Sequence, residues 1–209
     1  MKEVRVCVCD WSGVISDDRE PIYAAQMAVL RAHGKQVLSF EDWLRHPAHS
    51  APMLLHAMGL EGTDAYLMGL FRASLDAVGE RGCVPMMYAG VDEVLASIKE
   101  TGRRVVILSS HPHQNVHAEA RRYGVVSVID QLHGGVRDKA AGLVSICRSY
   151  EADPRAVMFV GDMINDIKSG KAAGVRTVGV CTGYHTREQL QREWPDHMFD
   201  TLHDVLRLL

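Results

Sequence analysis

The sequence lacks the features that would place it in several large classes of protein. Its five cysteines, at positions 7, 9, 83, 147 and 181, form no CxxC pair, which argues against a disulfide framework or a structural zinc site. No block of like charge accompanies the net charge of −3, so neither nucleic acid nor an anionic membrane is indicated as a partner. Its apolar runs are far shorter than the roughly 18 residues of a membrane helix, and no signal segment is visible, so we expect a cytoplasmic protein.

What the sequence does contain is an alternation of short apolar runs with helical periodicity from residue 85 onward. This alternation is typical of parallel strands joined by helices, and Val- and Ile-rich runs indicate strands covered on both faces. The predicted fold class is therefore α/β, with a doubly wound parallel sheet. The predicted strands span residues 4–9, 105–108, 125–129, 157–160 and 175–180, and the predicted helices span residues 91–98, 116–123, 143–150 and 202–209.

Between residues 17 and 84 the pattern changes, because apolar residues recur at helical spacing and no strand is indicated. Tyr23, Met27 and Leu30 form one stripe, and Ser39 is a candidate N-cap for a second helix. The predicted organisation is a core domain of residues 1–16 and 85–209, interrupted by a helical domain of residues 17–84. Such an insertion, beginning next to the carboxyl end of the first strand, suits a lid over the substrate crevice.

Polar side chains follow three of the predicted strands, and this predicts an active site at one edge of the sheet. They are Asp10, Ser109 and Asp162, each directly after an apolar run or its closing glycine. A carboxylate can attack phosphorus when a cation offsets the repulsion between the two negative groups. Carboxylate oxygens are also the ligands that Mg²⁺ prefers, so Asp10 and Asp162 are candidates to hold that ion together.

Further residues in the same segments are candidates to support the metal or to bind a phosphoryl group. Asp166 lies four residues after Asp162 at the start of a predicted helix. Ser109 and Ser110 offer hydroxyl and main-chain donors, and Lys139 offers a compact positive charge for phosphate oxygens. The expected partner is a small phosphorylated molecule.

In this combination the chain resembles the haloacid dehalogenase superfamily along almost its whole length. The stretches that carry the resemblance are "VCVCDWSGV", "VVILSS", Lys139 and "VMFVGDMINDIKSGKAAG", and the helical insertion looks like the family's type 1 cap. The resemblance implies that Asp10 becomes phosphorylated. It also implies that Mg²⁺ is bound by Asp10, the main-chain carbonyl of Ser12 and Asp162, with Asp166 supporting the metal shell.

Ser12 departs from the family pattern, because phosphatases of this superfamily usually carry an aspartate there as general acid and base. A positioned acid or base is worth roughly 10² to 10⁴ in rate, so slow turnover of ordinary phosphomonoesters is expected. Three interpretations remain open. The protein is a specialised Mg²⁺-dependent phosphatase, a hydrolase of carbon–phosphorus bonds, or a silenced member that binds a phosphorylated ligand or a protein.

The second interpretation depends on "DWSG", which is similar to the DWAG of phosphonoacetaldehyde hydrolases. That chemistry needs a lysine in the cap to form a Schiff base, and Lys35 is the candidate, although Lys35 is better explained as a solvated lysine in a loop.

Substrate recognition is expected to involve the insertion and the residues beside the phosphate site. Arg45, His46 and His49 in "LRHPAHSAP" are candidates to read an anionic leaving group, and a histidine there is also a candidate replacement for the missing acid. Trp11 lines the cavity or packs under the cap, and His111 follows the Ser109 strand closely enough to reach phosphate. A monomer or a homodimer is expected.

Overall fold

The computed structural model describes residues 3–48 and 50–209. Contacts between Cα atoms divide the chain into two units. One unit contains the residues up to Asp17 together with Met86–Leu209, and the other contains Asp18–Pro85.

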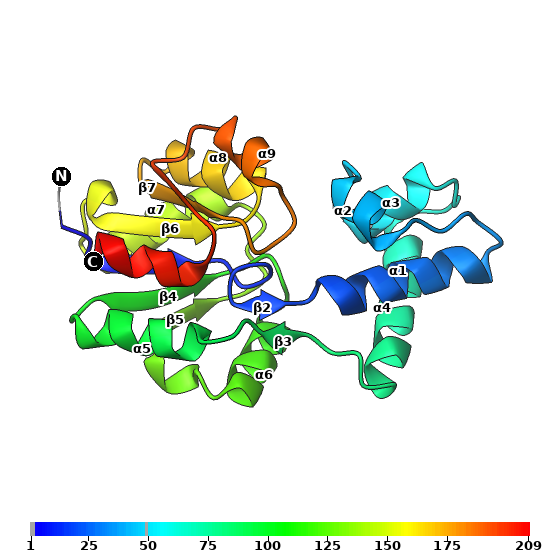
Figure 1. Ribbon diagram of the computed structural model, residues 1–209, viewed down its shortest axis with the longest axis horizontal. Helices are drawn as coiled ribbons and strands as arrows, with labels where there is room; N and C mark the ends of the chain where they lie inside the picture. Colours follow the sequence, from blue (N-terminus) through cyan, green and yellow to red (C-terminus); the bar gives the residue numbers. More distant parts are fainter. Residues whose placement is uncertain (1–2, 49) are drawn as a thin grey trace. The chain divides into compact units, whose positions relative to one another are not determined.

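The first unit is built on a six-stranded parallel sheet with the strand order β5-β4-β1-β6-β7-β8 (Figure 1). The predicted fold class, a doubly wound α/β sheet, is confirmed. The strands are β1 (Val6–Cys9), β4 (Arg104–Leu108), β5 (Gln131–His133), β6 (Val157–Gly161), β7 (Arg176–Val180) and β8 (His197–Phe199). A separate antiparallel pair, β2 (Ser16–Asp17) with β3 (Met86–Met87), lies where the chain leaves this unit and returns to it.

Successive residues of the central strands belong alternately to two hydrophobic clusters, one on each face of the sheet. Cys7 and Cys9 join the cluster under α5 (Val91–Glu100) and α6 (His113–Tyr123), whereas Val6 and Val8 join the cluster under α7 (Lys139–Ser149). This alternation is the period of two that a strand imposes, and burial on both faces explains the continuous apolar runs. Helix α8 (Ile164–Ala172) lies against α7, and α9 (Arg187–Gln191) follows β7.

One predicted strand is wrong. Residues 125–129 contain the short 3₁₀ helix η1 (Val126–Val128), and the strand β5 begins only at Gln131. Gly124 ends α6 in the left-handed conformation, with φ of 75°, and the chain then turns instead of extending. The N–H of Asp130 donates to the carbonyl of Val105, and its carboxylate accepts the N–H of Val105, which fixes where pairing starts. Strand propensity alone therefore misplaced this element.

The last predicted helix is of the 3₁₀ type, η3 (Leu202–Leu208), so its period was misjudged. Its buried residues Leu202 and Val205 are three apart, as that tighter helix requires. A further 3₁₀ turn, η2 (Pro154–Ala156), precedes β6. Elements β2, β3, β8 and α9 are not predicted from the sequence, because all of them are too short to show a period.

The second unit is helical. Its elements are α1 (Arg19–Ala32), α2 (Phe40–Arg45), α3 (Ala51–Ala57) and α4 (Asp64–Glu80). The predicted N-cap is confirmed, because the N–H of Asp42 donates to Ser39 Oγ at 3.1 Å. Helix α3 was not predicted and occupies the end of the segment interpreted as an interhelical loop. Helices α1 and α4 pack against each other along this unit.

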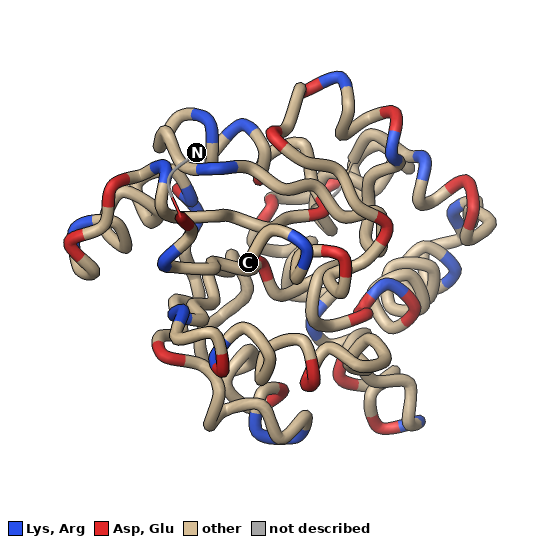
Figure 2. The backbone as a smooth tube through the Cα atoms, turned by 60° about the vertical axis from the view of Figure 1, so that its left-hand side comes forward, with Lys and Arg blue, Asp and Glu red and all other residues tan. Residues whose placement is uncertain are grey.

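Lys and Arg residues are interspersed with Asp and Glu along the backbone (Figure 2), in agreement with the sequence, which has no block of like charge. Within residues 3–48 and 50–209, no helix combines the length and the apolar character needed to cross a membrane.

Candidate active site

Three buried carboxylates meet at the carboxyl edge of the sheet. Asp10 follows β1 and Asp162 follows β6, and these strands are parallel neighbours in which Cys9 is paired with Val160. Asp166 lies in the first turn of α8, directly after the same loop. One oxygen from each of these carboxylates lies within 4.8 Å of the others. The strand ends thus bring Asp10 together with two acids that lie more than a hundred residues further along the sequence.

Lys139 is the counter-ion of this cluster. Its Nζ lies 2.7 Å from Asp10 Oδ2 and 2.6 Å from Asp166 Oδ1, and its side chain is 6% exposed. Burial by itself lowers the pKa of Lys139, but the charges of Asp10 and Asp166 outweigh burial and raise the pKa above its ordinary value. Lys139 therefore stays protonated. The neighbouring Arg137 is exposed, which distinguishes it from the buried lysine.

Asp162 is the acid of this cluster whose negative charge has the fewest partners among the described residues, because Lys139 forms its ion pairs with Asp10 and Asp166. Burial, together with the charges of Asp166 and Asp10, raises its pKa well above the ordinary value. The N–H of Tyr184 donates to its Oδ2 at 2.8 Å, whereas its buried Oδ1 has no hydrogen-bond partner within the described part of the chain. A buried carboxylate oxygen without a donor, beside two further carboxylates, is the environment a divalent cation stabilises. The donor set therefore fits the hard cation expected from the sequence.

Glycines that carry no functional signal in the sequence make room for these acids. A Cβ on Gly13 or Gly183 would lie 2.3 Å or 1.9 Å from Asp162 Oδ2, and a Cβ on Gly161 would lie 2.3 Å from Asp166 Cβ. Gly13 is also in the left-handed conformation, with φ of 75°. The acids are thus packed against bare backbone, a requirement visible in the sequence only as glycines beside the motifs.

Gly183→Ala is expected to weaken Mg²⁺ binding while the protein stays folded, because the added methyl group would displace the Asp162 carboxylate. We expect the Kd for Mg²⁺, measured by isothermal titration calorimetry, to rise about 10- to 100-fold, as when groups around a metal site are disturbed. Gly69→Ala is the matched control, since its Cβ would meet nothing within 4 Å. Equal affinities of Gly183→Ala and the natural protein would contradict a metal site at Asp162.

The predicted phosphate side of the site is a tightly held loop after β4. Ser109 is buried, its N–H donates to the carbonyl of His133 at 2.8 Å, and its Oγ accepts the N–H of His111 at 3.2 Å. Ser110 is exposed and His111 is half-buried. Ser109 is thus held by hydrogen bonds between the ends of β4 and β5, while phosphate binding by these residues stays a prediction.

Comparison with known proteins places this chain in a family. The family model described as "Hydrolase: haloacid dehalogenase-like hydrolase" matches residues 4–174. The chain belongs to this family. This confirms the superfamily indicated by the sequence motifs.

Relatives and solved structures agree with the membership. A phosphoglycolate phosphatase of Haemophilus influenzae is 31% identical over 137 residues, which cover 63% of this chain and 61% of the relative. The match thus spans only about three fifths of that relative's length. One from Synechococcus elongatus is 24% identical over 98% of this chain and 96% of its own. The crystal structure of a predicted phosphoglycolate phosphatase from Haemophilus somnus superimposes with a TM-score of 0.83 at 21% identity, covering 100% and 99% of the two chains, which shows the shared fold.

The two residues that follow Asp10 have different surroundings. Ser12 is half-buried and forms a β-bridge with Ser16. Trp11 is 1% exposed, its ring is stacked on Tyr123, and its Nε1 donates to Glu119. The indole therefore packs in the hydrophobic core with its N–H bonded to an acceptor, and a part in lining a substrate cavity stays a prediction.

The candidate residues of the insertion are engaged within their own unit. Arg45 forms an ion pair with Glu41 at 2.7 Å, although its side chain is 68% exposed. The N–H of Ala48 donates to His46 Nδ1 at 3.1 Å, and Lys35 is exposed. His49 lies outside the described residues. Roles in substrate recognition stay predictions for all of these.

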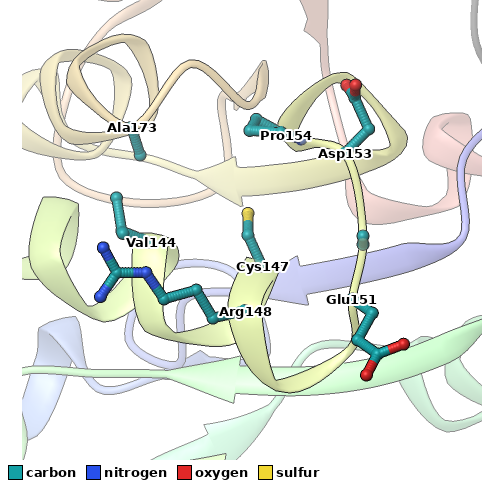
Figure 3. A pocket seen from close by; sticks show the side chains of 8 residues that line it. Val144, Cys147, Arg148, Glu151, Asp153, Pro154 and Ala173 are labelled. Carbon is teal, nitrogen blue, oxygen red and sulfur yellow. The ribbon is translucent and has the colours of Figure 1, made fainter.

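A cavity of about 440 Å³ lies away from the carboxylates, beside the last turns of α7 (Figure 3). Val144, Cys147, Pro154 and Ala173 line it, whereas Lys139 is at the opposite end of the same helix. This cavity is therefore separate from the candidate active site.

Proposed function

We propose that the chain is a Mg²⁺-dependent phosphatase that acts on a small phosphorylated metabolite through phosphorylation of Asp10. The observation that carries the proposal is the group of three buried carboxylates, two of which form ion pairs with the buried ammonium of Lys139. Membership of the haloacid dehalogenase-like hydrolases and the similarity to phosphoglycolate phosphatases support it.

The surroundings of Asp10 suit a nucleophile. The N–H of Trp11 donates to Oδ1 at 2.7 Å, and Lys139 donates to Oδ2 at 2.7 Å, so the carboxylate is held from both sides. Asp10 attacks phosphorus, the bond to the leaving oxygen breaks, and that oxygen takes a proton. Water then hydrolyses the aspartyl phosphate, which releases phosphate and restores the carboxylate.

The remaining groups offset negative charge. We propose that Asp10, Asp162 and the main-chain carbonyl of Ser12 hold Mg²⁺, with Asp166 in support. When bound, this ion reduces the repulsion between the carboxylate and the phosphoryl group. Lys139 and the Ser109 hydroxyl donate to phosphoryl oxygens, and Ser110 and His111 are further candidates. Arg45, His46 and His49 are proposed to read the part of the substrate beyond the phosphate.

Ser12 limits the rate in this proposal. A hydroxyl is essentially neutral near pH 7 and cannot protonate the leaving oxygen or activate water as a carboxyl group does. The missing acid and base corresponds to roughly 10² to 10⁴ in rate, or about 3 to 5 kcal/mol of barrier. Binding of the metal and of phosphate uses other atoms and is retained.

Phosphate release from a panel of small substrates tests the proposal. We expect phosphate release with phosphoglycolate, the compound in the names of the relatives, or with another small phosphomonoester, and we expect EDTA to abolish this release. Phosphonoacetaldehyde serves as a separate arm, in which release would assign the chain to carbon–phosphorus hydrolysis instead. No release from any compound in the presence of Mg²⁺, together with measurable binding of one of them, would leave a ligand-binding protein.

A further inference from the structure

A polar cluster made of Trp11, Ser16, Glu119 and Tyr123 connects α6 to the loop that carries Asp10. Glu119 Oε2 accepts the indole N–H of Trp11 at 2.6 Å and the hydroxyl of Ser16 at 3.1 Å. The hydroxyls of Ser16 and Tyr123 lie 2.8 Å apart. The rings of Trp11 and Tyr123 are stacked, with centroids 5.8 Å apart and an angle of 11° between their planes. Glu119 and Tyr123 are one helical turn apart, so α6 presents both groups together.

The backbone of Trp11 is the centre of the nucleophile loop. Its N–H donates to Asp10 Oδ1 at 2.7 Å, and its carbonyl accepts the N–H groups of Ile15 and Ser16, each at 2.9 Å. The residue whose side chain Glu119 holds is therefore the residue whose main chain orients the Asp10 carboxylate. The path from Glu119 to Asp10 contains a single intervening residue.

Packing alone does not require a carboxylate at position 119. The stack on Tyr123 and the surrounding core already bury the indole, and an apolar neighbour would fill the same space. A carboxylate that accepts from both an indole and a hydroxyl instead fixes the rotation of the ring, since charge-assisted hydrogen bonds are short and directional. It also joins the nucleophile loop to β2, the strand at which the chain leaves this unit.

We infer that Glu119 is a positioning residue for the nucleophile, acting through Trp11. The inference rests on the proposed function of Asp10. By fixing the indole, Glu119 fixes the main-chain N–H that holds Asp10 Oδ1 and the carbonyl of the next residue, Ser12. Small displacements of reacting groups cost up to about 100-fold in rate, so loss of this constraint affects turnover more than substrate affinity.

Selective ¹⁵N-tryptophan labelling tests the inference without using catalysis. The chain has three tryptophans, so the spectrum is simple, and loss of signals in Trp11→Phe assigns those of Trp11. In Glu119→Ala we expect both the indole and the backbone N–H signals of Trp11 to shift, while those of Trp43 and Trp194 stay in place. Glu119→Gln keeps an acceptor and is expected to keep the backbone signal. An unshifted backbone signal in Glu119→Ala would overturn the inference, whether or not the protein is a phosphatase.

Mg²⁺ titration and steady-state kinetics with p-nitrophenyl phosphate test whether Glu119 affects metal binding and turnover. We expect Glu119→Ala to lower kcat and to raise the Kd for Mg²⁺, each about 10- to 100-fold, with KM nearly unchanged. Glu119→Gln is expected to recover most of both quantities, and Glu93→Ala, at an exposed glutamate of α5, is the matched control. A lower melting temperature with unchanged kcat and Kd would show a merely structural role and overturn the inference.

Discussion

Asp10→Asn is expected to lower phosphate release about 10⁴-fold or more, since removal of a nucleophile leaves only the binding contribution to catalysis. Asparagine keeps the shape of the side chain and an oxygen for Trp11, but its amide is not a nucleophile toward phosphorus and it lacks the charge that pairs with Lys139. The measurement is the single-turnover rate with the best substrate of the panel at saturating Mg²⁺. Saturation separates loss of the nucleophile from weaker metal binding.

The control for this prediction is Asp92→Asn, which removes an exposed carboxylate in the first turn of α5. Its rate is expected to match that of the natural protein. Mass spectrometry of acid-quenched protein supplies a second readout, because a phosphoryl group on the peptide that contains Asp10 is expected in the natural protein and absent from Asp10→Asn. Retention of more than about a tenth of the rate by Asp10→Asn would exclude Asp10 as the nucleophile, given the size of the effect expected for such a group.

The central strands of the sheet were predictable because their surroundings leave a strong pattern in the sequence. Strands β1, β4 and β6 are covered on both faces, so almost every residue in them is apolar. Strand β7 is also buried throughout, although it begins with Arg176 and Thr177. The edge strands β5 and β8 contain three half-buried residues each, and this is too little for a periodic signal. The apolar run of residues 125–129, which precedes β5, has the stronger strand pattern and is predicted as the strand instead. Only pairing with β4, anchored by Asp130, decides where β5 begins.

The candidate site was predictable to the extent that one chemical group follows each strand. Parallel strands end at one edge of a sheet, so Asp10, Ser109 and Asp162 could be grouped without coordinates. The groups that hold them could not be found in this way. The contact between Trp11 and Glu119 joins residues 108 apart, and Gly183 matters only because the Asp162 carboxylate happens to lie against it. Such contacts arise from tertiary packing and leave no spacing in the sequence.

Ser12→Asp is expected to raise kcat for phosphomonoesters about 10²- to 10⁴-fold, the contribution of a positioned general acid and base. Ser12 is half-buried, so we expect a carboxylate at this position to keep contact with solvent. We also expect a change in pH dependence. A new carboxyl group that must be protonated to assist the leaving oxygen makes kcat fall as pH rises above its pKa, whereas the hydroxyl of Ser12 has no such titration. The measurement is the pH profile of kcat for both proteins at saturating Mg²⁺.

Ser127→Asp is the control for this change, because it adds the same charge at an exposed residue of η1. Its kcat is expected to equal that of the natural protein. If Ser12→Asp leaves kcat unchanged while Asp10→Asn abolishes turnover, proton transfer does not limit the natural reaction. The leaving group would then depart without help, and the natural substrate would carry a leaving oxygen of low pKa, such as that of an acyl phosphate. An acceleration of the expected size would instead show that the natural protein operates well below the rate its own nucleophile and metal site can support.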